Sequence, residues 1–222
     1  MTPLVLMIGG GSGAGKSTLA EWLKAKLAPV EAAILREDDY FIDHPEGAAA
    51  LDGLNFDDIA QKDHALLLLH LGGLKAGESV EKPLYDFSTH RRKRETETAA
   101  PSPVIIVEGT HILYREALLS LADLSVYIDT PDDIRLARRI LRDIGERGRQ
   151  TADVIAQYLR SVKPMHYRYT YPGRFKADMI VDASDPRVAD PFALSDDELE
   201  HPGAPVLHRV RRLLGKRTPA RA

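Results

Sequence analysis

The sequence predicts an α/β fold with a parallel central sheet of about five strands and helices on both faces of that sheet. Two patterns lead to this prediction. Apolar runs of strand length recur along the chain, and segments with helical spacing separate them. The runs are continuous rather than alternating, which is typical of strands in a sheet that is covered on both faces. Alternation of strands with helices is typical of parallel sheets.

Each predicted element has its own signal. The predicted strands are the apolar runs at residues 4–8, 32–35, 104–108, 124–128 and 177–181. The predicted helices have helical length and spacing and lie at residues 17–27, 64–71, 131–144 and 151–167. Residues 77–98 break the alternation, and their proline, aromatic residues and basic run predict a short hairpin or extended arm. We therefore expect one domain over residues 1–185 and a tail over residues 186–222 that forms one short helix.

The composition is that of an ordinary globular protein. The chain has 222 residues, a formal net charge of −3, 28% charged residues and 44% hydrophobic residues, which indicates neither a disordered nor a membrane-embedded chain. It contains no cysteine, so disulfides and thiolate metal ligands are excluded. No apolar run approaches the roughly 20 residues that span a bilayer, and the first run lacks the flanks of a signal peptide. We expect a cytoplasmic protein without a nucleic-acid or membrane partner, and leave open whether it forms a homo-oligomer.

A glycine-rich string follows the first predicted strand and precedes the first predicted helix. Residues 10–17 read GGSGAGKS, which satisfies the GxxxxGKS/T pattern in the context that this pattern requires. The glycines let backbone N–H groups point at phosphate oxygens, while Lys16 reaches the outer phosphates and the Ser17 hydroxyl holds Mg²⁺. The residues expected to bind the nucleotide here are Gly10, Gly11, Ser12, Gly13, Ala14, Gly15, Lys16, Ser17 and Thr18. The alternative is a glycine-rich turn that binds nothing.

Two carboxylates narrow the class of nucleotide-binding protein. GTPases, ATPases, motors and kinases share the glycine-rich loop, but no NKxD-like string for reading guanine follows it. Asp38 comes after the second predicted strand, where a carboxylate can accept the proton of an acceptor hydroxyl in a kinase. Glu108 ends a buried strand, where a carboxylate is costly unless it is paired or bound to metal. The alternatives are a solvated acidic turn at Asp38 and a Glu-Gly turn at Glu108. The expected Mg²⁺ ligands are Ser17, Asp38 and Glu108.

Residues 135–150 combine arginines with glycines. The arginines at a spacing of four, which stacks them on one face of a helix, are Arg135 with Arg139 and Arg138 with Arg142. Arg147 and Arg149 follow, beside Gly145 and Gly148. Such a segment suits a lid that closes over a transferring phosphoryl group and excludes water. The alternative is a solvated helix whose arginines pair with Asp132, Asp133, Asp143 and Glu146.

Together these strings resemble the uridine/cytidine kinase family, within the wider group that includes phosphoribulokinase. The similarity runs from about residue 4 to residue 181, and its matching strings are GGSGAGKS, EDDYF, NFD, PLYDFSTHRR, VIIVEG, DTPDDIRLARRILRDIGERGR and QYLRSVKPM. The resemblance implies a P-loop NTPase fold, the substrates ATP and a pyrimidine nucleoside, and Mg²⁺ as cofactor. The expected reaction is transfer of the ATP γ-phosphoryl group to the 5′-hydroxyl of uridine or cytidine.

The resemblance also implies a role for each matching residue. It makes Asp38 the base and Glu108 the second metal carboxylate, with Lys16 and Ser17 on the phosphates and Mg²⁺. It places Asp57 and Arg149 near the ribose hydroxyls. It assigns Tyr85, Phe87 and His90 to the pyrimidine pocket, with Gln157 nearby, and Arg139, Arg142 and Arg147 to the lid. Without the resemblance, Tyr85 and Phe87 would be predicted as core residues.

The chain departs from the family pattern at two strings, and other functions stay open. NFDDI stands where the family has NFDHP or similar, and DASDP stands where it has a proline-arginine-glycine turn near the adenine. One alternative is a related kinase that acts on a sugar phosphate or another small alcohol. A second is an ATP-binding switch protein with little turnover. A basic tail that contacts nucleic acid is a third, although a solvated helix face or an oligomer contact is favoured.

Overall fold

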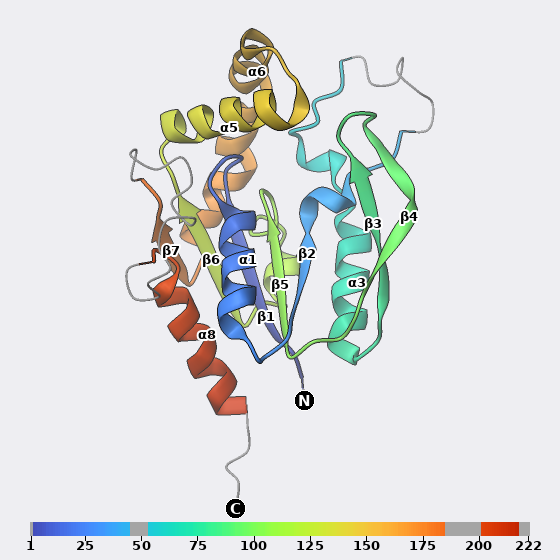
Figure 1. Cartoon of the computed structure of the whole chain (residues 1–222), viewed down its shortest axis with the longest axis vertical. Helices are drawn as coiled ribbons and strands as arrows, with labels where there is room; N and C mark the ends of the chain where they lie inside the picture. Colours follow the sequence, from blue (N-terminus) through green and yellow to red (C-terminus); the bar gives the residue numbers. More distant parts are fainter. Residues whose placement is uncertain (1, 45–52, 185–200, 218–222) are drawn as a thin grey trace, which may run out of the picture.

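The computed structural model describes residues 2–44, 53–184 and 201–217 and has a parallel sheet at its centre (Figure 1). Its strands are β1 (Leu4–Gly10), β2 (Ala32–Arg36), β5 (Val104–Gly109), β6 (Leu124–Asp129) and β7 (Met179–Asp182). They lie in the order β2-β5-β1-β6-β7, and every neighbouring pair is parallel. The predicted fold class and its five strands are confirmed.

The main helices match the predicted ones with shifted ends. They are α1 (Lys16–Leu27), α3 (His64–Ala76), α5 (Asp132–Arg147) and α8 (Ala204–Arg217), with the single turn α4 (Glu116–Leu119) after β5. The helix predicted at residues 151–167 is present, but its hydrogen bonding alternates between α and π turns: α6 (Thr151–Gln157), η3 (Tyr158–Val162), α7 (Lys163–Met165) and η4 (His166–Thr170), followed by the 3₁₀ turn η5 (Tyr171–Phe175). Pro164 lies inside this segment and has no N–H to donate, so regular α-helical bonding cannot continue through it. The wider turns of η3 and η4 lie on either side of the proline.

The predicted arm is a β-hairpin beside the main sheet. Strand β3 (Val80–Asp86) pairs antiparallel with β4 (Arg91–Ala99), and His90 in the connecting turn has a positive φ of 54°. Two 3₁₀ turns, η1 (Glu37–Tyr40) and η2 (Ile59–Gln61), lie between β2 and α3. An isolated bridge between Phe41 and Lys62 joins the chain after η1 to the chain after η2. This side of the molecule is therefore built from segments that are far apart in the sequence.

Strand β1 lies between two hydrophobic cores because its side chains alternate between the faces of the sheet. Leu4, Leu6 and Ile8 face the core that α1 and α8 cover. Val5 and Met7 face the core that α3 covers. Both faces are therefore buried, as the continuous apolar runs predict.

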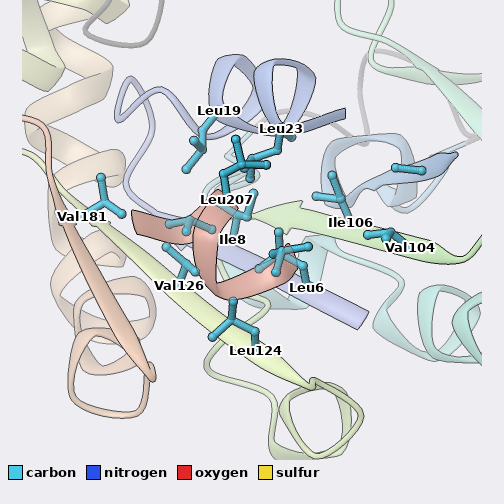
Figure 2. Close-up of a cluster of buried hydrophobic side chains, with 14 of the residues drawn as sticks. Leu6, Ile8, Leu19, Leu23, Val104, Ile106, Leu124, Val126, Val181 and Leu207 are labelled. Atoms are coloured by element: carbon cyan, nitrogen blue, oxygen red, sulfur yellow. The ribbon is translucent and has the colours of Figure 1, made fainter. Parts of the chain in front are cut away.

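The helix predicted in the tail is confirmed, and its apolar side belongs to the first of these cores. Figure 2 shows Leu207 of α8 packed with Leu19 and Leu23 of α1 over the sheet. Val206 and Leu207 are fully buried. The division of the chain at residue 185 remains a prediction. Within the described residues, no helix is long and apolar enough to cross a bilayer.

The first prediction concerns this packing. Leu207→Ala should lower the free energy of unfolding by about 2 to 5 kcal/mol, because it removes a fully buried side chain from a packed core. Urea unfolding measures the change, and His208→Ala on the exposed side of the same helix is the matched control. Equal stability of the two variants would show that α8 does not contribute to the core in solution.

Candidate active site

The glycine-rich loop turns from β1 into α1. Gly13 and Gly15 have φ values of 81° and 95°, in the left-handed region that favours glycine. Lys16 is the first residue of α1, and its Nζ donates to the Gly11 carbonyl at 3.1 Å. Burial lowers the pKa of Lys16, although Glu108 and Asp38 attract its charge. The first N–H groups of α1 and this lysine together form the expected phosphate site.

Ser17 and Glu108 contact each other beside the expected phosphate site. The Ser17 hydroxyl donates to Glu108 Oε1 at 2.8 Å, and burial raises the pKa of Glu108. A hydroxyl and a carboxylate suit Mg²⁺, which usually keeps several waters and phosphate oxygens as its other ligands. Among the described residues there is no cluster of three or more acidic, histidine or cysteine side chains that could hold a metal by themselves. Ser17 and Glu108 therefore fit a metal that the nucleotide helps to bind.

Asp38 lies in η1, directly after β2, and lines the main cleft. About half of its side chain, 54%, is exposed. Its Oδ1 pairs at 2.5 Å with Nζ of Lys62, whose ammonium lies 3.2 Å from the centre of the Phe41 ring. Burial alone would raise the pKa of Asp38, but Lys62 outweighs it and the pKa lies below its usual value. Asp38 is therefore ionised near neutral pH. Lys62 contacts its Oδ1, whereas Oδ2 has no hydrogen-bond partner among the described residues and can accept a proton.

Asp39, the next carboxylate along the chain, is engaged elsewhere. Its Oδ2 accepts from Lys82 of β3 at 3.1 Å, and that lysine is also paired with Glu97 of β4. Burial raises the pKa of Asp39. Asp39 therefore anchors the arm, whereas Asp38 faces the cleft.

Glu37 links the carboxyl end of β2 to the carboxyl end of β5. Its carboxylate is fully buried and accepts from the backbone N–H groups of Thr110 at 2.7 Å and His111 at 3.1 Å. His64 Nε2 lies 2.6 Å from its other oxygen. Burial alone would raise the pKa of Glu37, but the bond to His64 and the nearby cations outweigh it and hold the pKa well below its usual range. A Cβ at Gly109 would lie 2.4 Å from the Glu37 Cβ, so only glycine fits there.

The arginine segment forms the roof of the cleft, where α5 and α6 lie above the carboxyl ends of the strands (Figure 1). Arg139 Nη1 donates to the Ser12 hydroxyl of the phosphate loop at 3.0 Å. Arg142 and Arg147 also line the cleft. All three arginines form ion pairs with Asp143, which is fully buried. The alternative of a solvated helix also predicted pairing of the arginines with acidic residues, but this acidic residue lies in the protein interior.

Arg135 differs from the other arginines of α5. It is 1% exposed, donates to the Thr130 carbonyl at 3.1 Å and pairs with Asp132. A Cβ at Gly11 would lie 2.4 Å from its Nη1 atom, so the guanidinium supports the phosphate loop from behind. Arg135 therefore lies behind the phosphate loop, while the lid over residues 135–150 remains a prediction. Gly145 also lies inside α5, and only Gly148, with φ 61°, ends the helix.

The aromatic residues of the arm lie against two rings that the sequence did not single out. Tyr85 lies 4.8 Å from Phe41, and His90 stacks on Phe56 at 4.5 Å between ring centres. Phe87 lies 5.2 Å from Tyr85. Tyr85 is buried, like a core residue, yet its hydroxyl has no hydrogen-bond partner among the described residues and it lines the cleft. Burial, with Arg149 and Arg147, lowers the pKa of His90.

Asp57, Gln157 and Arg149 meet in one hydrogen-bond network. Asp57 Oδ2 accepts from the Ser161 hydroxyl at 2.6 Å and from Gln157 Nε2 at 3.4 Å. Gln157 Oε1 accepts from Arg149 Nη1 at 2.5 Å and from Arg139 Nη2 at 3.2 Å. This network lies between the aromatic residues and the phosphate loop.

Many of these groups line one cleft of about 1590 Å³. The predicted site residues that line it are Ser12, Asp38, Asp57, Tyr85, Phe87, His90, Arg139, Arg142, Arg147, Arg149 and Gln157. The glycines of the phosphate loop and Lys16, Ser17, Thr18 and Glu108 lie at the adjoining ends of β1, α1 and β5. The arrangement joins the expected phosphate site, the carboxylate of Asp38 and a group of aromatic residues.

The chain is similar to known proteins over most of its length. The model of the phosphoribulokinase/uridine kinase family matches residues 5–188. The chain belongs to this family. It is 41% identical over 183 residues to a uridine kinase of Brevibacillus brevis, covering 81% of this chain and 84% of that one. It is also 41% identical to a uridine kinase of Clostridium novyi, covering 82% of this chain and 88% of that one. The family resemblance in the sequence is confirmed.

Two solved structures of other kinases have the same fold at low identity. A D-glycerate 3-kinase of Cryptococcus neoformans aligns with a TM-score of 0.61 and 16% identity, covering 82% of this chain and 86% of that one. Phosphoribulokinase from Rhodobacter aligns with a TM-score of 0.58 and 14% identity, covering 88% of this chain and 75% of that one. These matches confirm the fold of P-loop kinases.

This member of the phosphoribulokinase/uridine kinase family has site residues that sequence reasoning missed. Lys62, Ser161, His111 and His166 all line the cleft. Nothing in the sequence separates them from other polar residues, because each reaches the cleft only through tertiary packing. His111 and His166 are buried, and each has an Nδ1 without a hydrogen-bond partner among the described residues. Burial lowers the pKa of His111 to about 4 and that of His166 to about 3.

The buried histidines predict a loss of stability in mild acid. Between about pH 6.5 and pH 3, the unfolded chain protonates His166 while the folded protein keeps it neutral, because the pKa in the folded state is about 3. Stability therefore falls as the pH falls through this range. At pH 5 the contribution is about 2 kcal/mol, from roughly 1.5 pH units at 1.36 kcal/mol each.

Urea unfolding at pH 7 and pH 5 measures this effect. His166→Asn should lose less stability between the two pH values than the wild type does, by about 2 kcal/mol. His208→Asn, at an exposed position, is the matched control and should lose as much as the wild type. An unchanged pH dependence in His166→Asn would contradict the prediction.

Proposed function

We propose that the protein is a uridine/cytidine kinase, which transfers the γ-phosphoryl group of ATP to the 5′-hydroxyl of a pyrimidine nucleoside in pyrimidine salvage. The observation that carries the proposal is the position of Asp38. It is an ionised carboxylate at the wall of one cleft, with the phosphate site on one side and the aromatic pocket on the other. The uridine kinases that are 41% identical over most of their length support the choice of acceptor.

On the donor side, the protein supplies positive charge and backbone donors. The phosphates of ATP lie along the loop and the start of α1, where Lys16 compensates their charge. Ser17 and Glu108 would hold Mg²⁺, which neutralises charge that develops on the phosphate oxygens. Arg139 contacts the loop at Ser12 and so adds a cation to the same site. These groups form no covalent bond with the substrate, because catalysis of phosphoryl transfer comes mainly from positioning and charge stabilisation.

On the acceptor side, Asp38 accepts the proton of the 5′-hydroxyl. Lys62 holds Oδ1 of Asp38, which directs Oδ2 to the hydroxyl. Asp57 and Arg149 are held together by Gln157 and suit the ribose hydroxyls. Tyr85, Phe87 and His90 offer a flat base stacking surfaces and two polar groups at a ring edge. We propose the cytoplasm, where ATP is supplied, as the site of the reaction.

A panel of acceptors with Mg-ATP tests the proposal. Uridine or cytidine should give the 5′-monophosphate, whereas ribulose 5-phosphate, pantothenate and purine nucleosides should be poor acceptors. 5′-Deoxyuridine should bind without reacting, because it lacks only the acceptor hydroxyl. Product formation is measured by coupled ADP release and by chromatography of the nucleotide. Phosphorylation of another alcohol, with neither pyrimidine nucleoside accepted, would refute the assignment.

Replacing the base should affect turnover rather than binding. Asp38→Asn should lower kcat by roughly 10² or more with a modest change in KM, as expected for a group that acts mainly in the transition state. Asp39→Asn is the matched control, because Asp39 is bound to Lys82 away from the cleft. A rise in KM alone for Asp38→Asn would make Asp38 a binding residue. A loss of kcat in Asp39→Asn alone would transfer the role of base to Asp39.

A further inference from the structure

The side chain of Asp143 is the meeting point of four arginines. It is fully buried in α5. Its Oδ1 lies 2.9 Å from Arg142 Nη2 and 3.4 Å from Arg147 Nη1. Its Oδ2 lies 3.5 Å from Arg139 Nε and 3.7 Å from Arg149 Nη1, which is close enough for ion pairs but makes no hydrogen bond. One carboxylate thus faces four guanidinium groups, so the group keeps a large excess of positive charge.

Two of these arginines also reach the two substrate sides of the cleft. Arg139 donates to Ser12 of the phosphate loop at 3.0 Å. Arg149 donates to Gln157 at 2.5 Å and so joins the network of the acceptor side. Asp143 lies between them and contacts both. Its carboxylate therefore links the donor half of the cleft with the acceptor half.

Electrostatic repulsion would separate these arginines without the carboxylate. The guanidinium of Arg147 lies 4.5 Å from the centre of the Phe87 ring, on the arm. Burial lowers the pKa of Arg139 and of Arg147, and neighbouring arginines lower both further. Like charges that converge on one carboxylate repel one another, and the repulsion is strongest where the side chains are buried, as at Arg139. Asp143 is the anion that all four arginines share, while Asp57 also attracts Arg139 and Asp38 also attracts Arg147.

We propose that Asp143 is a positioning residue, which keeps the four arginines converged so that they meet the transferring phosphoryl group without rearrangement. The inference rests on the proposed kinase function and deepens it. Asp143 touches no substrate in this assignment and acts through the arginines. A displaced cation costs rate even when it stays in the site, since a misplacement of about 1 Å can cost roughly 100-fold.

The backbone carbonyl of Asp143 also ends α5, so a test must change the side-chain charge and leave the backbone intact. Its carbonyl accepts from the N–H groups of Gly148 and Arg149 and so ends α5. Asp143→Asn keeps this carbonyl and the size of the side chain, and removes only the charge. Asp133→Asn, at an exposed position of the same helix, is the matched control.

The proposal predicts that kcat falls while the affinity for Mg-ATP does not fall. In Asp143→Asn, kcat should fall by up to about 100-fold, because the arginines are no longer held in place. The Kd of Mg-ATP, from titration calorimetry, should stay equal or become tighter, since the site gains positive charge. Asp133→Asn should match the wild type in both. A fall in kcat together with weaker ATP binding, or no fall in kcat, would overturn the proposal.

Two further measurements test the proposal if no acceptor is known or if Asp143→Asn does not fold. The Nε–H resonances of the arginines, assigned by NMR, should lose dispersion in Asp143→Asn and keep it in Asp133→Asn, and unchanged resonances would overturn the proposal. This readout holds even if the wild type phosphorylates no pyrimidine nucleoside, an outcome that refutes the proposed function alone. If Asp143→Asn does not fold, Arg142→Gln in the same chain should restore folding by removing one competing charge. A double variant that also fails to fold would make Asp143 a structural residue.

Discussion

The buried carboxylate of Glu37 is the interaction on which the site depends. A buried carboxylate is costly unless hydrogen bonds compensate its lost hydration. Glu37 is compensated by two backbone N–H groups after β5 and by His64 at the start of α3. It therefore ties two parallel strands to the helix that covers them. Gly109 makes this possible, because any side chain there would collide with Glu37.

The contacts of Glu37 fix the position of Asp38 relative to Glu108. Asp38 follows Glu37 directly, and Glu108 precedes Gly109, so both carboxylates are held by the same contact. Lys62 then fixes Asp38 from the acceptor side, with its ammonium over the Phe41 ring. Lys62 outweighs the effect of burial and keeps the pKa of Asp38 below its usual value. An exposed turn without Lys62 would leave the carboxylate free to rotate.

The fold and the substrate side of the protein follow different constraints. Kinases with 14% and 16% identity share the fold, and their names describe different acceptors. The sheet and the phosphate loop are therefore compatible with several alcohols, since function is decided by the site rather than by the fold. In this chain the arm, the segment after β2 and the helix after residue 151 all line the cleft. Arg139 and Arg149 both donate to Gln157 of that helix.

The sequence alone determined the elements whose signals are local. Continuous apolar runs predict the strands, because burial on both faces of a parallel sheet removes the alternation of polar residues. The phosphate loop is readable because its glycines, lysine and serine are consecutive and act through their own backbone. Asp38 and Glu108 could be predicted because each directly follows an apolar strand, and the ends of parallel strands meet at one edge.

Only the tertiary structure decided which charges meet. Lys62 reaches Asp38 across 24 positions of sequence, and Ser161 reaches Asp57 across 104. Arg135 has the same helical spacing as the lid arginines, yet packing turned it beneath the phosphate loop. The predicted helix after residue 151 is present, but wider π turns lie on either side of Pro164. Side-chain pairing depends on how separate elements pack, and helical or strand periodicity carries no information about that packing.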